Sequence, residues 1–145
     1  MTVRQQRQAV AAMPAALSAA ALGAPLLAAF GYTLSAWAIL QFFSLACHQD
    51  PARSFWIAGA PVAVCARCLG IYLGAVAGAW FTAPRGKILW LLAAAVLVSL
   101  LDYFTEFAGL HGNWPIVRFV LGAILGVSLG ALVAASRHRF LSAGS

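Results

Sequence analysis

Four runs of about 20 mostly apolar residues dominate this sequence. A helix of that length is what the ~30 Å hydrocarbon layer of a bilayer requires. The runs are Leu26–Ala46, Val62–Thr82, Ile88–Phe107 and Pro115–Ala135. Proline or glycine stands in each break between them, as is typical of connecting loops. Because backbone polar groups in lipid must be hydrogen-bonded within their own segment, the runs predict four transmembrane helices.

Composition excludes a soluble domain. Hydrophobic residues make up 63% of the chain and charged residues 8%, whereas a soluble domain is about half apolar and about a quarter charged. A chain of 145 residues that folds in water leaves a large share of its surface wet, so it cannot bury this much apolar surface. We therefore expect an all-α integral membrane bundle with the lipid bilayer as its main partner.

The predicted bundle occupies residues 26–135 and has a segment on either side. Residues 1–25 resemble a signal peptide, because Arg4 and Arg7 precede a run of small apolar residues. That run continues directly into the first span, which favours an uncleaved interfacial helix broken near Pro14 and Pro25. Residues 136–145 form a basic tail.

Positively charged residues give the expected orientation. Six of the nine Lys and Arg residues lie at the N-terminus, in the loop after the second span and at the C-terminus. Because short cytoplasmic loops carry the excess of Lys and Arg, both termini are predicted to be cytoplasmic. The loop Cys47–Pro61 and the turn Gly109–Trp114 then face outward. The cations are also too scattered to form the basic face that binds nucleic acid.

With this orientation, most residues capable of chemistry lie at the outer ends of the spans. They are Cys47, His48, Gln49, Asp50, Arg53, Cys65, Arg67, Cys68, Asp102, Glu106, His111, Asn113 and Arg118. An ionisable group within a span costs several kcal/mol and by default marks a functional site with a partner. The cytoplasmic half is apolar apart from its flanking cations, which speaks against a transport pathway.

Arg118 is predicted to pair with a carboxylate of the third span. Asp102 and Glu106 are spaced i, i+4 and so share one helix face. Arg118 lies at about the same depth on the next, antiparallel span. Such a pair serves either a functional site or only the register of the bundle.

Two spans carry glycine at every fourth position. The glycines are Gly70, Gly74 and Gly78 in one span and Gly122, Gly126 and Gly130 in the other. Such repeats allow helix backbones to approach closely in lipid. Packing within one bundle is the favoured interpretation, and association with a second copy or another membrane subunit is the alternative.

The three cysteines predict a site for zinc or another transition metal. Cys65 and Cys68 share one helix face, and Arg67 and the helix N-terminus favour their thiolates. A zinc site takes four N, S or O ligands, for which Cys47, His48, Cys65 and Cys68 are the candidates. Asp102, Glu106 or His111 are alternatives to His48, because adjacent residues ligate one ion awkwardly. Gln49, Arg53, Arg67 and Arg118, with the carboxylates, are expected to surround the site.

Two other functions remain open. In a redox protein, Cys65 and Cys68 form a reversible disulfide that exchanges with Cys47, and a quinone is the cofactor. This arrangement is similar to thiol–quinone oxidoreductases of the bacterial inner membrane, which carry a second cysteine pair that this chain lacks. In an accessory subunit of a larger membrane complex, the polar cluster only holds the bundle together. No motif of a hydrolase or a di-iron protein is present, so the sequence names no reaction.

Several of these residues resemble the signature of a small prokaryotic membrane-protein family, domain of unknown function 2085 (DUF2085). The matching positions are Cys-His-Gln at 47–49, Arg-Ser-Phe at 53–55, Val-Cys-Ala-Arg-Cys-Leu-Gly-Ile-Tyr-Leu-Gly at 64–74, Asp102, and Arg118 with Gly122. The resemblance covers roughly Leu40–Gly126. It implies a multi-pass protein of the prokaryotic cytoplasmic (inner) membrane and supports the cysteine cluster, but it implies no activity.

Overall fold

The computed structural model describes residues 2–110, 112 and 114–142. Its elements are α1 (Val3–Ala29), α2 (Thr33–Ser44), the 3-10 helix η1 (Pro51–Arg53), β1 (Trp56–Ile57), β2 (Ala60–Pro61), α3 (Ala66–Gly78), α4 (Arg85–Phe107) and α5 (Pro115–Ser142). The two short strands form an antiparallel hairpin with Trp56 opposite Pro61. The predicted helical class is confirmed, with this hairpin as a small addition.

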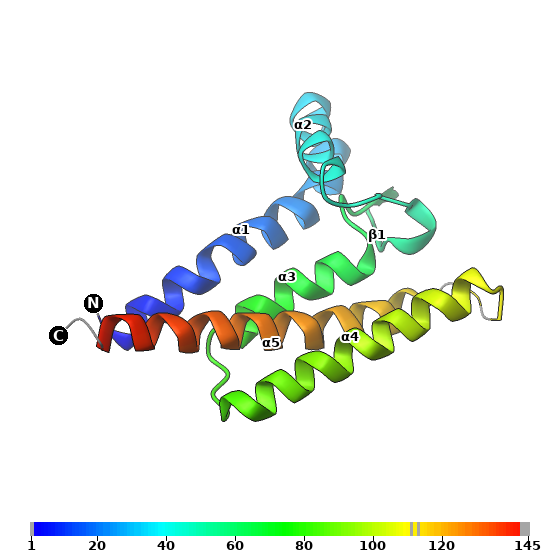
Figure 1. Cartoon of the computed structure of the whole chain (residues 1–145). Helices are drawn as coiled ribbons and strands as arrows, with labels where there is room; N and C mark the ends of the chain where they lie inside the picture. Colours follow the sequence, from blue (N-terminus) through cyan, green and yellow to red (C-terminus); the bar gives the residue numbers. More distant parts are fainter. Residues whose placement is uncertain (1, 111, 113, 143–145) are drawn as a thin grey trace.

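Four of the helices, α1, α3, α4 and α5, run side by side, with α3 and α5 parallel to each other and antiparallel to α1 and α4, and α2 projects away from them (Figure 1). The start of α1 and the end of α5 lie at one end of the molecule. The hairpin, the start of α3 and the start of α5 lie at the other end. The described residues that the sequence assigned to one depth are therefore gathered at one end of the bundle.

Three helices are long and apolar enough to cross a membrane: α1, α4 and the part of α5 up to Ser136. Large apolar side chains cover the outside of α4; Trp90, for example, is 79% exposed and Phe104 is 61% exposed. Soluble proteins rarely expose continuous apolar surfaces of this extent. The surface of α4 is therefore that of a helix in contact with lipid.

The predicted first span, Leu26–Ala46, is wrong. The helix α1 ends at Ala29, and α2 has only 12 residues. Between them Gly31 adopts a left-handed backbone conformation, with φ of +86°. The backbone N–H of Tyr32 donates to the carbonyl of Leu27 at 2.8 Å, which closes the end of α1 as in many glycine-terminated helices.

The helix breaks predicted near Pro14 and Pro25 are absent. Residues 3–29 form one helix that continues through Pro14 and Pro25, where the sequence predicted breaks. A proline removes one backbone donor, and transmembrane helices tolerate that loss when neighbouring groups satisfy the freed carbonyls. The carbonyl that Pro25 frees is that of Ala21, and the backbone N–H of Ala63 donates to it at 3.3 Å. The boundary at residue 25 therefore falls inside a candidate span.

The predicted second span, Val62–Thr82, is helical only over the 13 residues of α3. Its first three residues, Val62–Val64, lie outside the helix and are 0–2% exposed. The backbone N–H of Ala63 donates to the carbonyl of Ala21 in α1 at 3.3 Å. This apolar stretch is buried as irregular chain, which a hydropathy pattern cannot distinguish from a helix.

The third and fourth spans agree better with prediction. The helix α4 begins three residues before the predicted Ile88 and ends at the predicted Phe107. The helix α5 begins at the predicted Pro115 and continues to Ser142, through the first part of the expected basic tail.

The glycine repeats face each other across the α3–α5 interface. A Cβ atom added at Gly74 would come closer than 3.0 Å to the carbonyl oxygen of Ala123, and one added at Gly126 would meet Ile71 in the same way. Real Cβ atoms essentially never approach so closely. The repeats are therefore used within one chain, as the favoured interpretation predicted. They hold the N-terminal ends of α3 and α5 together, where the polar residues lie.

Candidate metal centre

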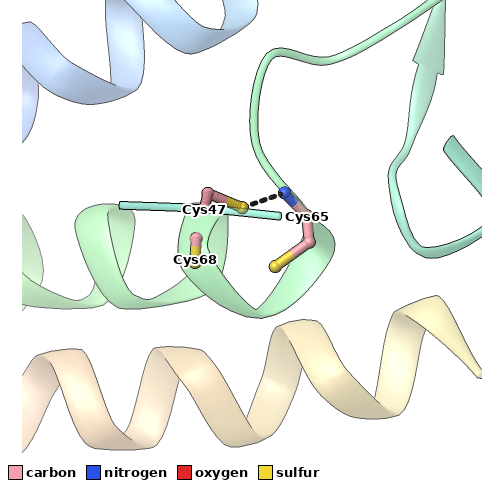
Figure 2. Close-up of side chains that lie close together, drawn as sticks. All are labelled: Cys47, Cys65 and Cys68. Atoms are coloured by element: carbon pink, nitrogen blue, oxygen red, sulfur yellow. Dashed lines mark hydrogen bonds between the residues drawn. The ribbon is translucent and has the colours of Figure 1, made fainter. Parts of the chain in front are cut away.

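The three cysteine sulfurs converge at the start of α3 (Figure 2). Cys47 follows α2, Cys65 is the N-cap residue of α3, and Cys68 lies in its first turn. All three Sγ atoms lie within 4.8 Å of one another, and none of the three forms a disulfide. Two segments 18 residues apart in the sequence thus supply one cluster.

Gln49 holds these two segments together. Its side-chain Nε2 donates to the carbonyl oxygens of Leu40 and Ala63, both at 2.8 Å. The residue itself has a positive φ of 51°, which turns the chain back after Cys47. The backbone N–H of Cys65 then donates to the Sγ of Cys47 at 3.2 Å. The sequence placed Gln49 near the site, but this bridging role needs the fold.

The environment of Cys47 favours a thiolate. Its side chain is 7% exposed and belongs to a core cluster with Phe43, Val64 and Leu69. The thiols of Cys65 and Cys68 and the backbone N–H of Cys65 hold the pKa of the Cys47 thiol well below its usual range, although burial opposes them. Since metals bind thiolates, the charge that a cation needs is already favoured here.

The spacing of the sulfurs fits a tetrahedral ion. With Zn–S bonds of ~2.3 Å, sulfur ligands of one zinc lie about 3.8 Å apart. Sulfurs within 4.8 Å of one another reach that spacing with small side-chain rotations. Three protein ligands in a tetrahedral site leave one position for another group.

The predicted fourth ligand is not part of this cluster. Among the described residues, only the three cysteines form a group with metal-ligand spacing, and His48 is not a member. His48 instead lines a small cavity beside Cys65. Asp102 and Glu106 are engaged by arginines, and His111 lies outside the described residues.

The carboxylates of α4 form an ion-pair network with three arginines. Asp102 accepts from Arg67 Nη2 at 2.5 Å and lies 3.6 Å from Arg118 Nε. Glu106 accepts from Arg118 Nη2 and lies 3.3 Å from Arg53 Nη2. The pairing of Arg118 with the third predicted span is therefore present, and it involves both carboxylates. The network ties η1, α3, α4 and α5 together at the cysteine end.

Two links of this network do not follow from the sequence. Arg67 was expected to favour the thiolates, whereas its guanidinium pairs with Asp102. The pairing of Arg53 with Glu106 depends on the packing of η1 against α4, which no sequence pattern indicates. Arg53 is further held by Asp50 at 3.3 Å, and Asp50 caps η1 by accepting from the Ala52 N–H at 2.9 Å.

A cavity of about 90 Å³ borders both the cysteine cluster and the ion-pair network. It is lined by His48, Asp50, Arg53, Cys65, Arg67 and Arg118. The cysteine cluster and the network are therefore parts of one site, with Cys65 as the residue that belongs to the cluster and faces the cavity.

Residues 47–132 match the family described as predicted membrane protein (DUF2085). The match begins at Cys47 and includes all three cysteines and the whole ion-pair network. The chain belongs to the DUF2085 family. The family resemblance noted in the sequence is thereby confirmed, and it covers more than half of the chain.

Two archaeal proteins are similar to this DUF2085 member. The uncharacterized protein MJ1492 of Methanocaldococcus jannaschii is 36% identical over 119 residues, which cover 73% of this chain and 76% of the relative. An uncharacterized protein of Methanothermobacter thermautotrophicus is 33% identical over 104 residues, covering 68% of this chain and 94% of the relative. No solved structure matches the chain significantly.

Proposed function

We propose that this DUF2085 member is a metal-binding membrane protein that holds a zinc-type ion through Cys47, Cys65 and Cys68. The observation that supports the proposal is the convergence of three thiols, from two segments, within 4.8 Å. Soft thiolate ligands select zinc or copper(I) over hard cations such as magnesium and calcium. The low pKa of the Cys47 thiol favours the first thiolate of that ligand set.

The proposed site faces outward from the cytoplasmic membrane of a prokaryote, in a multi-pass protein. The support is the distribution of charge. Arg4 and Arg7 lie near the start of α1, and Arg85 and Lys87 in the first turn of α4. Both helices begin at the end of the bundle opposite to the start of α3 (Figure 1). An excess of Lys and Arg marks the cytoplasmic side. Exposed Trp56 and Trp114 at the cysteine end, and Trp90 toward the other, fit the two interfacial belts.

Metal stoichiometry tests the proposal. The full chain, purified in detergent, is loaded with zinc, freed of excess ion and analysed by mass spectrometry of the elements. We expect about one zinc per chain, and serine in place of any one cysteine should weaken retention at least about tenfold. His48→Ala is the matched control, since His48 lies beside the cluster but outside it, and it should retain zinc. Zinc that is absent, or retained equally by the serine variants, contradicts the proposal.

Thiol counting separates the alternatives. The metal site predicts three reactive thiols in the metal-free protein and protection of all three by zinc. A Cys65–Cys68 disulfide in a protein that takes up no metal would favour the thiol–quinone alternative. Three reactive thiols without metal uptake would favour an accessory subunit, in which the cluster serves only packing.

A further inference from the structure

The cavity beside Cys65 presents three guanidinium groups from three different elements. Arg53 belongs to η1, Arg67 to the first turn of α3 and Arg118 to α5. Of the carboxylates in the network, Asp50 is the one that lines the cavity, while Asp102 and Glu106 are not among its lining residues. Three positive charges and one negative charge therefore line the cavity, and Asp102 and Glu106, which pair with these arginines outside the lining, balance the other two.

Two buried donors of these arginines have no hydrogen-bond partner. The Nε atoms of Arg67 and Arg118 are inaccessible to solvent and form no hydrogen bond, although Arg118 Nε lies 3.6 Å from an Asp102 oxygen. The Arg118 side chain is 6% exposed, and an unsatisfied buried donor is costly, more so on a charged group. Both residues line the cavity. A guanidinium carries five N–H donors, more than these ion pairs use, so acceptor oxygens in this space can bind the remaining Nη donors of the arginines.

The cavity has the size for such a group. A single ordered water needs a cavity volume of ~10–15 Å³, and this cavity has a volume of about 90 Å³. Several waters or one small oxyanion fit. Arginine is the preferred residue for oxyanions, since its planar fork donates two parallel hydrogen bonds to phosphate or carboxylate oxygens.

We propose that the cavity formed by Arg53, Arg67, Arg118 and His48 binds a phosphate-type oxyanion beside the cysteine cluster. The ligand is either free phosphate or the phosphate of a lipid headgroup, since both present the same oxygens. One extension rests on the proposed function: Cys65 lies in both the cluster and the cavity wall, so an oxyanion oxygen supplies the fourth ligand of the bound metal.

Calorimetric titration of inorganic phosphate into the metal-free full chain, at constant ionic strength, tests the cavity itself. We expect saturable binding, weakened about tenfold by Arg53→Gln, since one charge-assisted pair is lost. Arg53 is suited to this test because its side chain is 40% exposed, and Arg53→Lys should lose less than Arg53→Gln. Arg4→Gln, an exposed cation at the other end of the bundle, should bind as the unmodified protein does. Circular dichroism verifies that each variant is folded.

A second titration, with a soluble short-chain phosphatidic acid, distinguishes the two sources. Binding of this probe alone assigns the site to a lipid headgroup, and binding of inorganic phosphate assigns it to the free ion. Failure of both probes, or affinities that Arg53→Gln leaves unchanged, overturns the proposal. Repeating the titration with zinc-loaded protein tests the coordination step. Tighter phosphate binding supports that step, and equal affinity refutes it while leaving the cavity site intact.

Discussion

Removal of Arg118 tests the ion-pair network most sharply. Arg118 is 6% exposed, pairs with Glu106 and lies 3.6 Å from Asp102. Breaking a buried pair by removing one partner costs about 3–5 kcal/mol when the other charge is left uncompensated. Here each carboxylate keeps a second arginine, Arg67 or Arg53. We therefore expect Arg118→Met to cost less, about 2–3 kcal/mol, close to one charge-assisted hydrogen bond.

The converse substitution should cost more. In Glu106→Gln, Arg118 keeps only Asp102, which already pairs with Arg67, so a buried positive charge is uncompensated. The expected loss is about 3–5 kcal/mol. The double variant Arg118→Met/Glu106→Gln should lose less than the sum of the two single losses, since the two residues contact each other.

Unfolding of the full chain in mixed micelles, followed by circular dichroism, measures these differences. Arg85→Met is the control, because Arg85 is an exposed cation in the first turn of α4, and it should change stability by less than about 0.5 kcal/mol. If Arg118→Met unfolds like the unmodified protein, or if the two single losses add in the double variant, the network does not stabilise the fold.

Three further expectations concern packing, the loop and topology. In the same unfolding assay, Gly126→Ala should destabilise the protein by more than about 2 kcal/mol, because its Cβ would overlap the carbonyl of Ile71. Gly86→Ala is the control: its Cβ would have nothing within 4 Å, so it should be neutral or slightly stabilising. Gln49→Ala should lower the unfolding free energy by about 1–3 kcal/mol and weaken zinc retention, because two carbonyls lose their donor; unchanged zinc retention would exclude Gln49 from the site. A periplasm-dependent phosphatase fused after Ser145 should be inactive, and an active fusion would reverse the proposed orientation.

Part of the fold could be predicted from the sequence because hydropathy and helix punctuation agree there. The helices α4 and α5 have long apolar runs and flanking proline or glycine, and their predicted limits at Phe107 and Pro115 match. The first span failed because the run was read as continuous across Gly31. That glycine is the signal that was available, since glycine after an apolar run is the usual end of a helix.

The second span failed for a different reason. Val62–Val64 are apolar because the start of the bundle buries them against α1, and no local pattern distinguishes buried irregular chain from helix. The prolines of α1 led to the opposite error, because they predicted breaks in a segment that is one continuous helix. In lipid the chain has no better alternative than to keep its remaining backbone hydrogen bonds, so Pro14 and Pro25 stay inside the helix.

The candidate site could be predicted from the depth of its residues along the spans rather than from local motifs. Placing Cys47, Cys65 and Cys68 at one end of antiparallel helices was sufficient to predict that they meet, and the same reasoning paired Arg118 with α4. The partner of each individual guanidinium was not predictable, because it depends on side-chain packing between η1, α3 and α5. The position of His48 in the cavity wall, apart from the cluster, depends on the turn at Gln49.

X-ray absorption at the zinc edge of the metal-loaded protein tests the central claim most directly. The spectrum counts the sulfur neighbours of the ion and measures their distances. Three sulfurs at ~2.3 Å and one lighter atom at ~2.0 Å are expected, with loss of one sulfur in each of Cys47→Ser, Cys65→Ser and Cys68→Ser. A zinc ion surrounded only by oxygen and nitrogen, or a sulfur count that these variants leave unchanged, would contradict the proposed metal centre.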